Sequence, residues 1–161
     1  MTRILRALAC AALAFLPAVV PAQPAARPPE AEMTSAQLLA LIQSDRKGLV
    51  SRNMSLTPEE SAKFWPIYEA QQKELARPEQ ERLRAVLDYV NTGAQVTGAN
   101  AQRLVQTILD AEQDEVRIRR KYWDRLLKVL PADKAARYMQ IENKMRAVQA
   151  YETARVMPLA R

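Results

Sequence analysis

Only three of the 161 residues of this chain are glycine. Tight turns depend on residues that tolerate positive φ, and glycine does so without steric cost, so three glycines leave little material for a fold with many turns. The length is sufficient for one domain with an adequate hydrophobic core. The sequence therefore favours an all-α fold.

Histidine is absent from the chain. Without imidazole there can be no Ser-His-Asp triad, no Cys-His dyad and no imidazole-ligated zinc or haem. The facial triad of non-haem iron is excluded for the same reason. The sequence therefore predicts a protein that is not an enzyme and carries no cofactor.

The first 22 residues have the features of a secretory signal peptide. Arg3 and Arg6 precede an uncharged apolar run over positions 7–20, and small residues follow at Pro21 and Ala22. The run is shorter than the roughly 20 apolar residues that a membrane span needs. We therefore expect cleavage after Ala22, export to the periplasm and no transmembrane segment in the mature chain.

Cys10 is the only cysteine of the chain and lies within the signal peptide, so the mature chain is expected to have none. Ala7 stands where a lipoprotein signal would prefer leucine, which argues against lipidation of Cys10. Without disulfides, the stability of an exported protein has to come from packing alone.

The mature chain is expected to be mildly basic. Loss of Arg3 and Arg6 from the 24 basic residues leaves 22 against 18 acidic ones, a net charge of +4. For an exported chain, this excess favours acidic polypeptides, lipid head groups or cell-wall polymer as partners, and no nucleic acid.

Residues 23–34 are expected to form a disordered linker, and residues 35–161 a helical domain. The linker has three prolines and few large apolar side chains. Helical patterning begins after Thr34 or Ser35, either of which can cap a first helix, and Gly48 is a predicted weak point inside it.

The clearest local signal is LTPEE at positions 56–60. The Thr57 side chain can accept from the Glu60 amide, and the Glu60 carboxylate can accept from the Thr57 amide. Pro58 fits the first helical position, where no amide hydrogen is needed. The pattern predicts a capping box that opens a second helix.

Pro66 and Pro78 each remove a backbone donor from this second helix, so we expect it to bend at both places or to break at Pro78. Residues 91–99 hold two glycines and predict a loop. Apolar residues then keep helical spacing over 100–130, and Pro131 is expected to stop that helix and open the last one. The sequence thus predicts about four helices and no sheet.

The LTPEE element at 56–60 and the related LPADK element at 130–134 each open a predicted helix. Together with the signal peptide and the cysteine-free helical body, they resemble the Spy/CpxP group of periplasmic proteins, which carry the LTXXQ motif. Glu60 replaces the motif glutamine in the first copy. Lys134 replaces it in the second copy, which also lacks the threonine. The chain is therefore identified as a divergent member of the wider superfamily.

This resemblance implies an ATP-independent periplasmic chaperone or envelope-stress adaptor that binds unfolded or partner proteins. It also implies long, kinked antiparallel helices in a hairpin or bundle, and a curved homodimer that holds clients on a basic concave face. Metal-sensing relatives use histidine, cysteine or acidic ligands, and the absence of the first two argues against a sensing role here.

Five basic residues of the predicted long helix are candidates for client binding, because cations attract acidic segments: Arg117, Arg120, Lys121, Arg125 and Lys128. Tyr122 and Trp123 lie among them and could contact apolar segments, but their helical spacing assigns them more simply to the core.

The acidic residues of the same helix could hold a hard cation through oxygen ligands. They are Asp110, Glu112, Asp114 and Glu115. A simpler explanation is pairing with bases four residues on, as in Glu115 with Arg119, Asp124 with Lys128 and Glu142 with Arg146. We therefore predict a solvated face and no metal site.

Phe64, Trp65 and Tyr68 form a second set of candidate client-binding residues. They could line a groove near Pro66, but large aromatic side chains beside a capped helix start usually anchor the helix to its neighbours. The core is therefore the favoured interpretation of these three.

Two further functions remain open at this stage. One is a periplasmic sensor or regulatory subunit that binds a membrane signalling partner, with Pro66 and Pro78 as hinges. The other is a structural envelope protein that binds anionic polymer.

Overall fold

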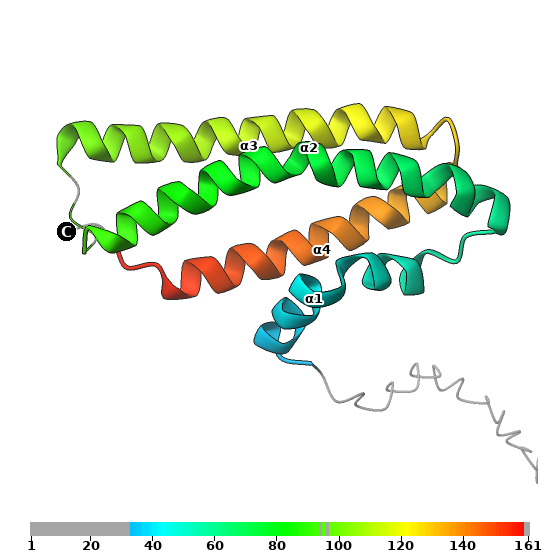
Figure 1. Ribbon diagram of the computed structural model, residues 1–161, viewed down its shortest axis with the longest axis horizontal. Coiled ribbons are helices and arrows are strands. Elements are labelled where there is room, and N and C mark those ends of the chain that lie inside the picture. The colour runs from blue at the N-terminus through cyan, green and yellow to red at the C-terminus, as the bar shows by residue number, and fades with distance from the viewer. Residues whose placement is uncertain (1–32, 94, 96, 160–161) are drawn as a thin grey trace, which may run out of the picture. The chain divides into compact units, whose positions relative to one another are not determined.

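The computed structural model describes residues 33–93, 95 and 97–159. The predicted signal peptide, its cleavage site and nearly all of the linker lie outside this part. The described residues form four helices and no strands, which confirms the all-α prediction: α1 (Ser35–Met54), α2 (Pro58–Asn91), α3 (Gly98–Leu126) and α4 (Ala132–Val156) (Figure 1). Among these helices, none combines the length and apolar character of a membrane span.

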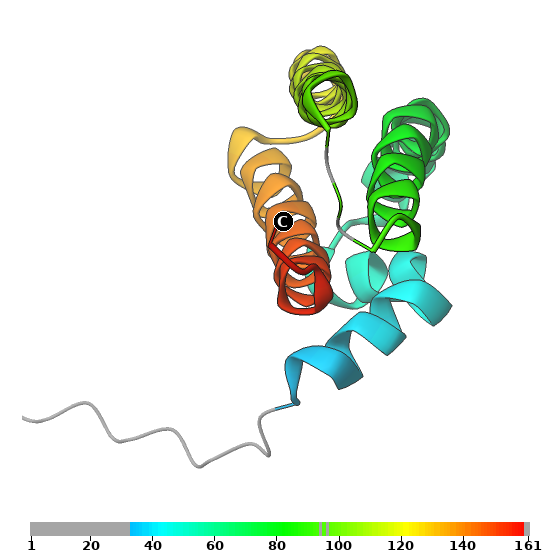
Figure 2. The ribbon, with the colours of Figure 1, turned by 90° about the vertical axis from the view of Figure 1, so that its left-hand side faces the viewer.

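The helices associate in two pairs, because α3 packs along α2 and α1 packs along α4. In the end-on view of Figure 2, α2, α3 and α4 lie at the corners of a triangle, and α1 lies on the side away from α3. The expected hairpin packing of antiparallel helices is thereby confirmed.

Both α1 and α2 begin with a capping box. Thr57 Oγ1 accepts from the Glu60 amide at 3.2 Å, and the Thr57 amide donates to Glu60 Oε2 at 2.8 Å. Pro58 occupies the first helical position. The predicted start of α2 is confirmed, and α1 begins in the same way with Thr34 and Gln37.

The irregular point of α1 is Asp45, three residues before the weak point predicted at Gly48. Asp45 has φ −148° and ψ 52°, and its Oδ1 accepts from the Gly48 amide at 2.9 Å. The carboxylate thus caps the second half of the helix. A Cβ at position 48 would lie 2.1 Å from Asp45 Oδ2, so glycine leaves room for the carboxylate in this position.

α2 continues through Pro66 and Pro78. Figure 1 shows it as one bowed helix, so the alternative of a break at Pro78 is wrong. A proline inside a helix costs about 3 kcal/mol because a hydrogen bond is lost and the ring clashes with the preceding turn. Burial of Leu75 and of Pro78 itself offsets this cost.

α3 ends at Leu126 and not at Leu130 as predicted. Residues 127–130 form a turn in which the Leu130 amide donates to the Leu126 carbonyl oxygen at 2.9 Å, and the Leu130 side chain is buried. The apolar run therefore continues past the end of the helix because the turn also contributes to the core. Pro131 is the N-cap of α4.

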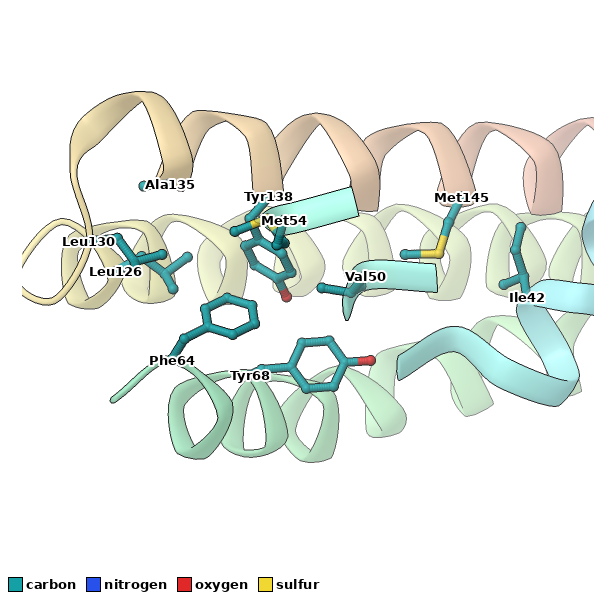
Figure 3. Close-up of a cluster of buried hydrophobic side chains, with 10 residues drawn as sticks. All are labelled: Ile42, Val50, Met54, Phe64, Tyr68, Leu126, Leu130, Ala135, Tyr138 and Met145. Atoms are coloured by element: carbon teal, nitrogen blue, oxygen red, sulfur yellow. The ribbon is translucent and has the colours of Figure 1, made fainter. Parts of the chain in front are cut away.

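The main core takes side chains from all four helices (Figure 3): Ile42, Val50, Met54, Phe64, Tyr68, Leu126, Leu130, Ala135, Tyr138 and Met145. The Tyr138 ring contacts the Phe64 ring edge-on at a centroid distance of 5.2 Å, and the Tyr68 ring at 6.1 Å. The Tyr138 hydroxyl donates to Gln71 Oε1 at 2.7 Å. Burial raises the pKa of Tyr68 to about 12, so its hydroxyl stays protonated at neutral pH.

Glu60 and Lys134, which replace the glutamine of the LTXXQ motif in its two copies, contact each other. Lys134 Nζ lies 2.6 Å from Glu60 Oε2, and both side chains are largely shielded from solvent. The hydrogen bond from Lys134, followed by that from the Thr57 amide, lowers the pKa of Glu60. One carboxylate therefore caps α2 and ties it to the first turn of α4.

The capping box predicts the effect of substitutions at Thr57. Thr57→Ala removes the acceptor of the Glu60 amide and should lower the free energy of unfolding by about 0.5–2 kcal/mol, whereas Thr57→Ser should leave it nearly unchanged. Denaturant unfolding measures both values. An alanine variant as stable as the parent would show that this side chain is not a cap.

Glu60→Gln keeps an oxygen that can accept from the Thr57 amide but removes the charge that Lys134 contacts. Because the folded state lowers the pKa of Glu60, the carboxylate stabilises the fold above its ordinary pKa, and this contribution is lost as the pH falls through the lowered value. The parent should therefore be more stable than the variant at neutral pH and equally stable in strong acid. A difference in unfolding free energy between parent and variant that does not change with pH would contradict this explanation.

Candidate functional site

One face of α3 is used for packing within the domain. Ala111, Ile118, Tyr122 and Leu126 are buried on this face, and Ile118 and Tyr122 pack with Leu75 of α2. The Tyr122 hydroxyl donates to Glu74 Oε1 of α2 at 2.8 Å. This contact keeps the opposite side of α3 turned away from α2.

A second set of apolar residues, on α3 and at its C-cap, is exposed. Val105, Leu109, Val116 and Leu127 have exposed fractions of 55%, 53%, 54% and 42%. The first three are separated by four and seven residues, spacings that keep side chains on one face of a helix. Leu127 follows as the C-cap, with φ −61° and ψ −18°. These four residues are called the outer stripe below. Large side chains exposed in a row are typical of surfaces that bind another molecule.

The five predicted basic residues are all exposed; four lie on α3, and Lys128 lies in the turn that follows it. Two of them are paired with acids: Arg117 with Asp114 at 2.6 Å, and Lys121 with Glu74 at 2.7 Å. The pairing with Arg117, together with that of Arg77, lowers the pKa of Asp114. Part of the predicted positive charge is therefore neutralised within the protein.

The other three basic residues, Arg120, Arg125 and Lys128, take no part in the ion pairs of residues 33–159. The guanidinium of Arg125 lies 4.9 Å from the centre of the Tyr122 ring. Arg120 follows Val116 by four residues and therefore lies on the outer stripe, and Lys128 follows Leu127 directly. The structure thus combines exposed cations with exposed apolar side chains on α3 and the turn that follows it.

Two of the three aromatic candidates are core residues. Phe64 and Tyr68 have exposed fractions of 0% and 4%, so neither offers a surface for a client in this structure. Trp65 is half-buried, donates from Nε1 to Ser61 Oγ at 2.8 Å and lies under Lys47 Nζ at 5.0 Å. The favoured interpretation of these residues as core agrees with this burial.

Two of the acidic residues of α3, Asp114 and Glu115, pair with bases within the domain. Glu115 pairs with Arg119 at 3.1 Å as predicted, but Glu142 pairs with Arg46 of α1 at 2.5 Å and not with Arg146. Within the described residues, no group of three or more acidic side chains is arranged to hold a metal ion.

α2 carries a shorter exposed apolar row. Leu83, Leu87 and Val90 are 56%, 50% and 43% exposed, with spacings of four and three residues. The sequence pattern did not separate these residues, or those of the outer stripe, from the buried ones.

Comparison of the chain with models of protein families, with characterised proteins and with solved structures finds no match.

Proposed function

We propose that the protein binds unfolded or partner polypeptides without catalysis, as an ATP-independent chaperone or envelope-stress adaptor in the periplasm. The observation that carries this proposal is the outer stripe of α3. Its four apolar side chains are each about half exposed, although the same helix buries another apolar face in the domain. Covering such a row would remove apolar surface from water, which is the main source of affinity for unfolded chains.

The cations of α3 complement this apolar row. Arg120 lies within the outer stripe and Lys128 lies at its end, and neither charge is paired within the described residues. Long-range attraction speeds the encounter with acidic segments, while short-range apolar contacts slow dissociation. A surface with both properties suits a protein that captures varied polypeptides.

The resemblance to the Spy/CpxP group supports the same function, because its members are chaperones and stress proteins with a basic client-binding face. The resemblance also implies a homodimer, which sedimentation of the purified protein would measure. The two alternatives differ in what they require: a regulatory subunit needs one partner, whereas an anionic polymer needs the cations and not the outer stripe.

The first test removes the outer stripe. Leu109→Gln combined with Val116→Gln keeps good helix formers on α3 while removing two apolar side chains. Each loss should cost about 1 kcal/mol of binding, so roughly tenfold or more protein should be needed to suppress aggregation of an unrelated unfolding protein. The matched control is Tyr151→Gln with Val156→Gln, which removes two exposed side chains of α4. Equal activity of both double variants would refute the proposed surface.

The second test removes the unpaired cations. Arg120→Gln with Lys128→Gln should slow capture of an acidic unfolded chain at low salt. The difference should vanish as the Debye length falls from about 10 Å at 0.1 M to about 3 Å at 1 M. Lys73→Gln with Lys144→Gln removes the same net charge from exposed positions on α2 and α4 and serves as control. Capture that depends on the cations but not on Leu109 and Val116 would favour the polymer-binding alternative.

A further inference from the structure

The domain contains a cavity that is partly open to solvent and is lined by charged and apolar side chains. Its volume is about 330 Å³, and all four helices contribute to its wall. The charged residues of the wall that carry the argument are Arg46, Glu79, Arg82, Glu115, Arg119 and Glu142. A cavity of this size lies at the lower end of the range of ligand pockets, about 300–1,000 Å³.

Two carboxylates of the cavity wall are buried and only half satisfied. Glu115 and Glu142 have exposed fractions of 5% and 6%. Each pairs through Oε2, with Arg119 at 3.1 Å and with Arg46 at 2.5 Å. The Oε1 atoms of both have no hydrogen-bond partner among the described residues. A buried acceptor in this state is unfavourable unless something in the cavity donates to it.

Two donors of the cavity wall are in the same situation. The Nε atoms of Arg46 and Arg82 are buried without a hydrogen-bond partner in the described part of the chain. Arg82 Nε lies 3.5 Å from Glu115 Oε1, which is close enough for charge attraction but outside hydrogen-bonding geometry. The cavity therefore presents unsatisfied positive donors and unsatisfied negative acceptors together.

This combination limits the chemistry of an occupant. An anion alone would satisfy the guanidinium groups and leave the buried carboxylate oxygens unpaired, and a cation alone would do the reverse. An occupant with both an ammonium and a carboxylate satisfies both sets.

We propose that this cavity binds a small zwitterion of the size of an amino acid or dipeptide. Its ammonium group donates to the Oε1 atoms of Glu115 and Glu142, and its carboxylate accepts from Arg46 and Arg82. Such a ligand contacts all four helices and stabilises the folded state in proportion to the logarithm of its concentration. The site is distinct from the outer stripe, which lies on the outside of α3.

The test uses the purified protein and three probes of nearly equal size. L-alanyl-L-alanine carries both charges, its N-acetylated form lacks the ammonium, and its C-terminal amide lacks the carboxylate. Calorimetric titration at millimolar concentrations should detect the dipeptide, and each blocked form should bind about tenfold more weakly or worse. No binding of any probe would show that the cavity holds only water. Equal binding of all three would refute recognition of a zwitterion.

Glu115→Gln removes one acceptor charge from the cavity without changing its shape, and Glu112→Gln removes a charge from the exposed side of the same helix as control. Dipeptide binding should weaken about tenfold in the first variant and persist in the second. Equal binding in both would place the ligand elsewhere and overturn the proposal. If the first variant does not fold, NMR titration of the parent protein with the dipeptide locates the binding site. Shifts of the Gln71 and Gln140 side-chain amides, which line the cavity, support the site, and shifts confined to the outer stripe refute it.

Discussion

The contact of Tyr138 with the aromatic side chains of α2 holds the two helix pairs together. Tyr138 is fully buried on α4, its ring packs edge-on against Phe64 and Tyr68, and its hydroxyl donates to the buried Gln71. Burial of the rings stabilises the contact, and the edge-to-face packing and the buried hydrogen bond also fix the orientation of the rings. Because this junction takes Phe64 and Tyr68 inside, these two side chains offer no surface to a client.

α3 is held in place mainly by its contacts with α2. Glu74 of α2 accepts from Tyr122 and pairs with Lys121, so one carboxylate ties the buried and the exposed sides of α3 to α2. Lys121 is therefore partly a structural residue, although it was predicted for client binding. Arg120 and Lys128 form no ion pair within the described residues. The proposed capture of acidic segments depends on these two cations and on the apolar side chains beside them.

The sequence predicted local features well, because they depend on near neighbours. The capping box at Thr57 is an example, since its partners are three residues apart. The pairing of Glu60 with Lys134 joins positions 74 residues apart and could not be inferred before the fold was known. Helical spacing groups apolar residues by face but does not say which face meets a partner, so Val116 and Ile118 could not be distinguished. Proline chemistry alone also overstated the break at Pro78, where burial holds the helix together.

The central claim is that the outer stripe of α3 contacts unfolded polypeptides. Site-specific photo-crosslinking tests it most directly, with a photoreactive phenylalanine in place of Val116 and, in a second variant, in place of Tyr151 on α4. Both positions are more than half exposed, at 54% and 59%, so accessibility is matched. The account predicts that an unfolding client crosslinks strongly at position 116 and weakly at 151. Equal crosslinking at both positions, or crosslinking only at 151, would contradict it.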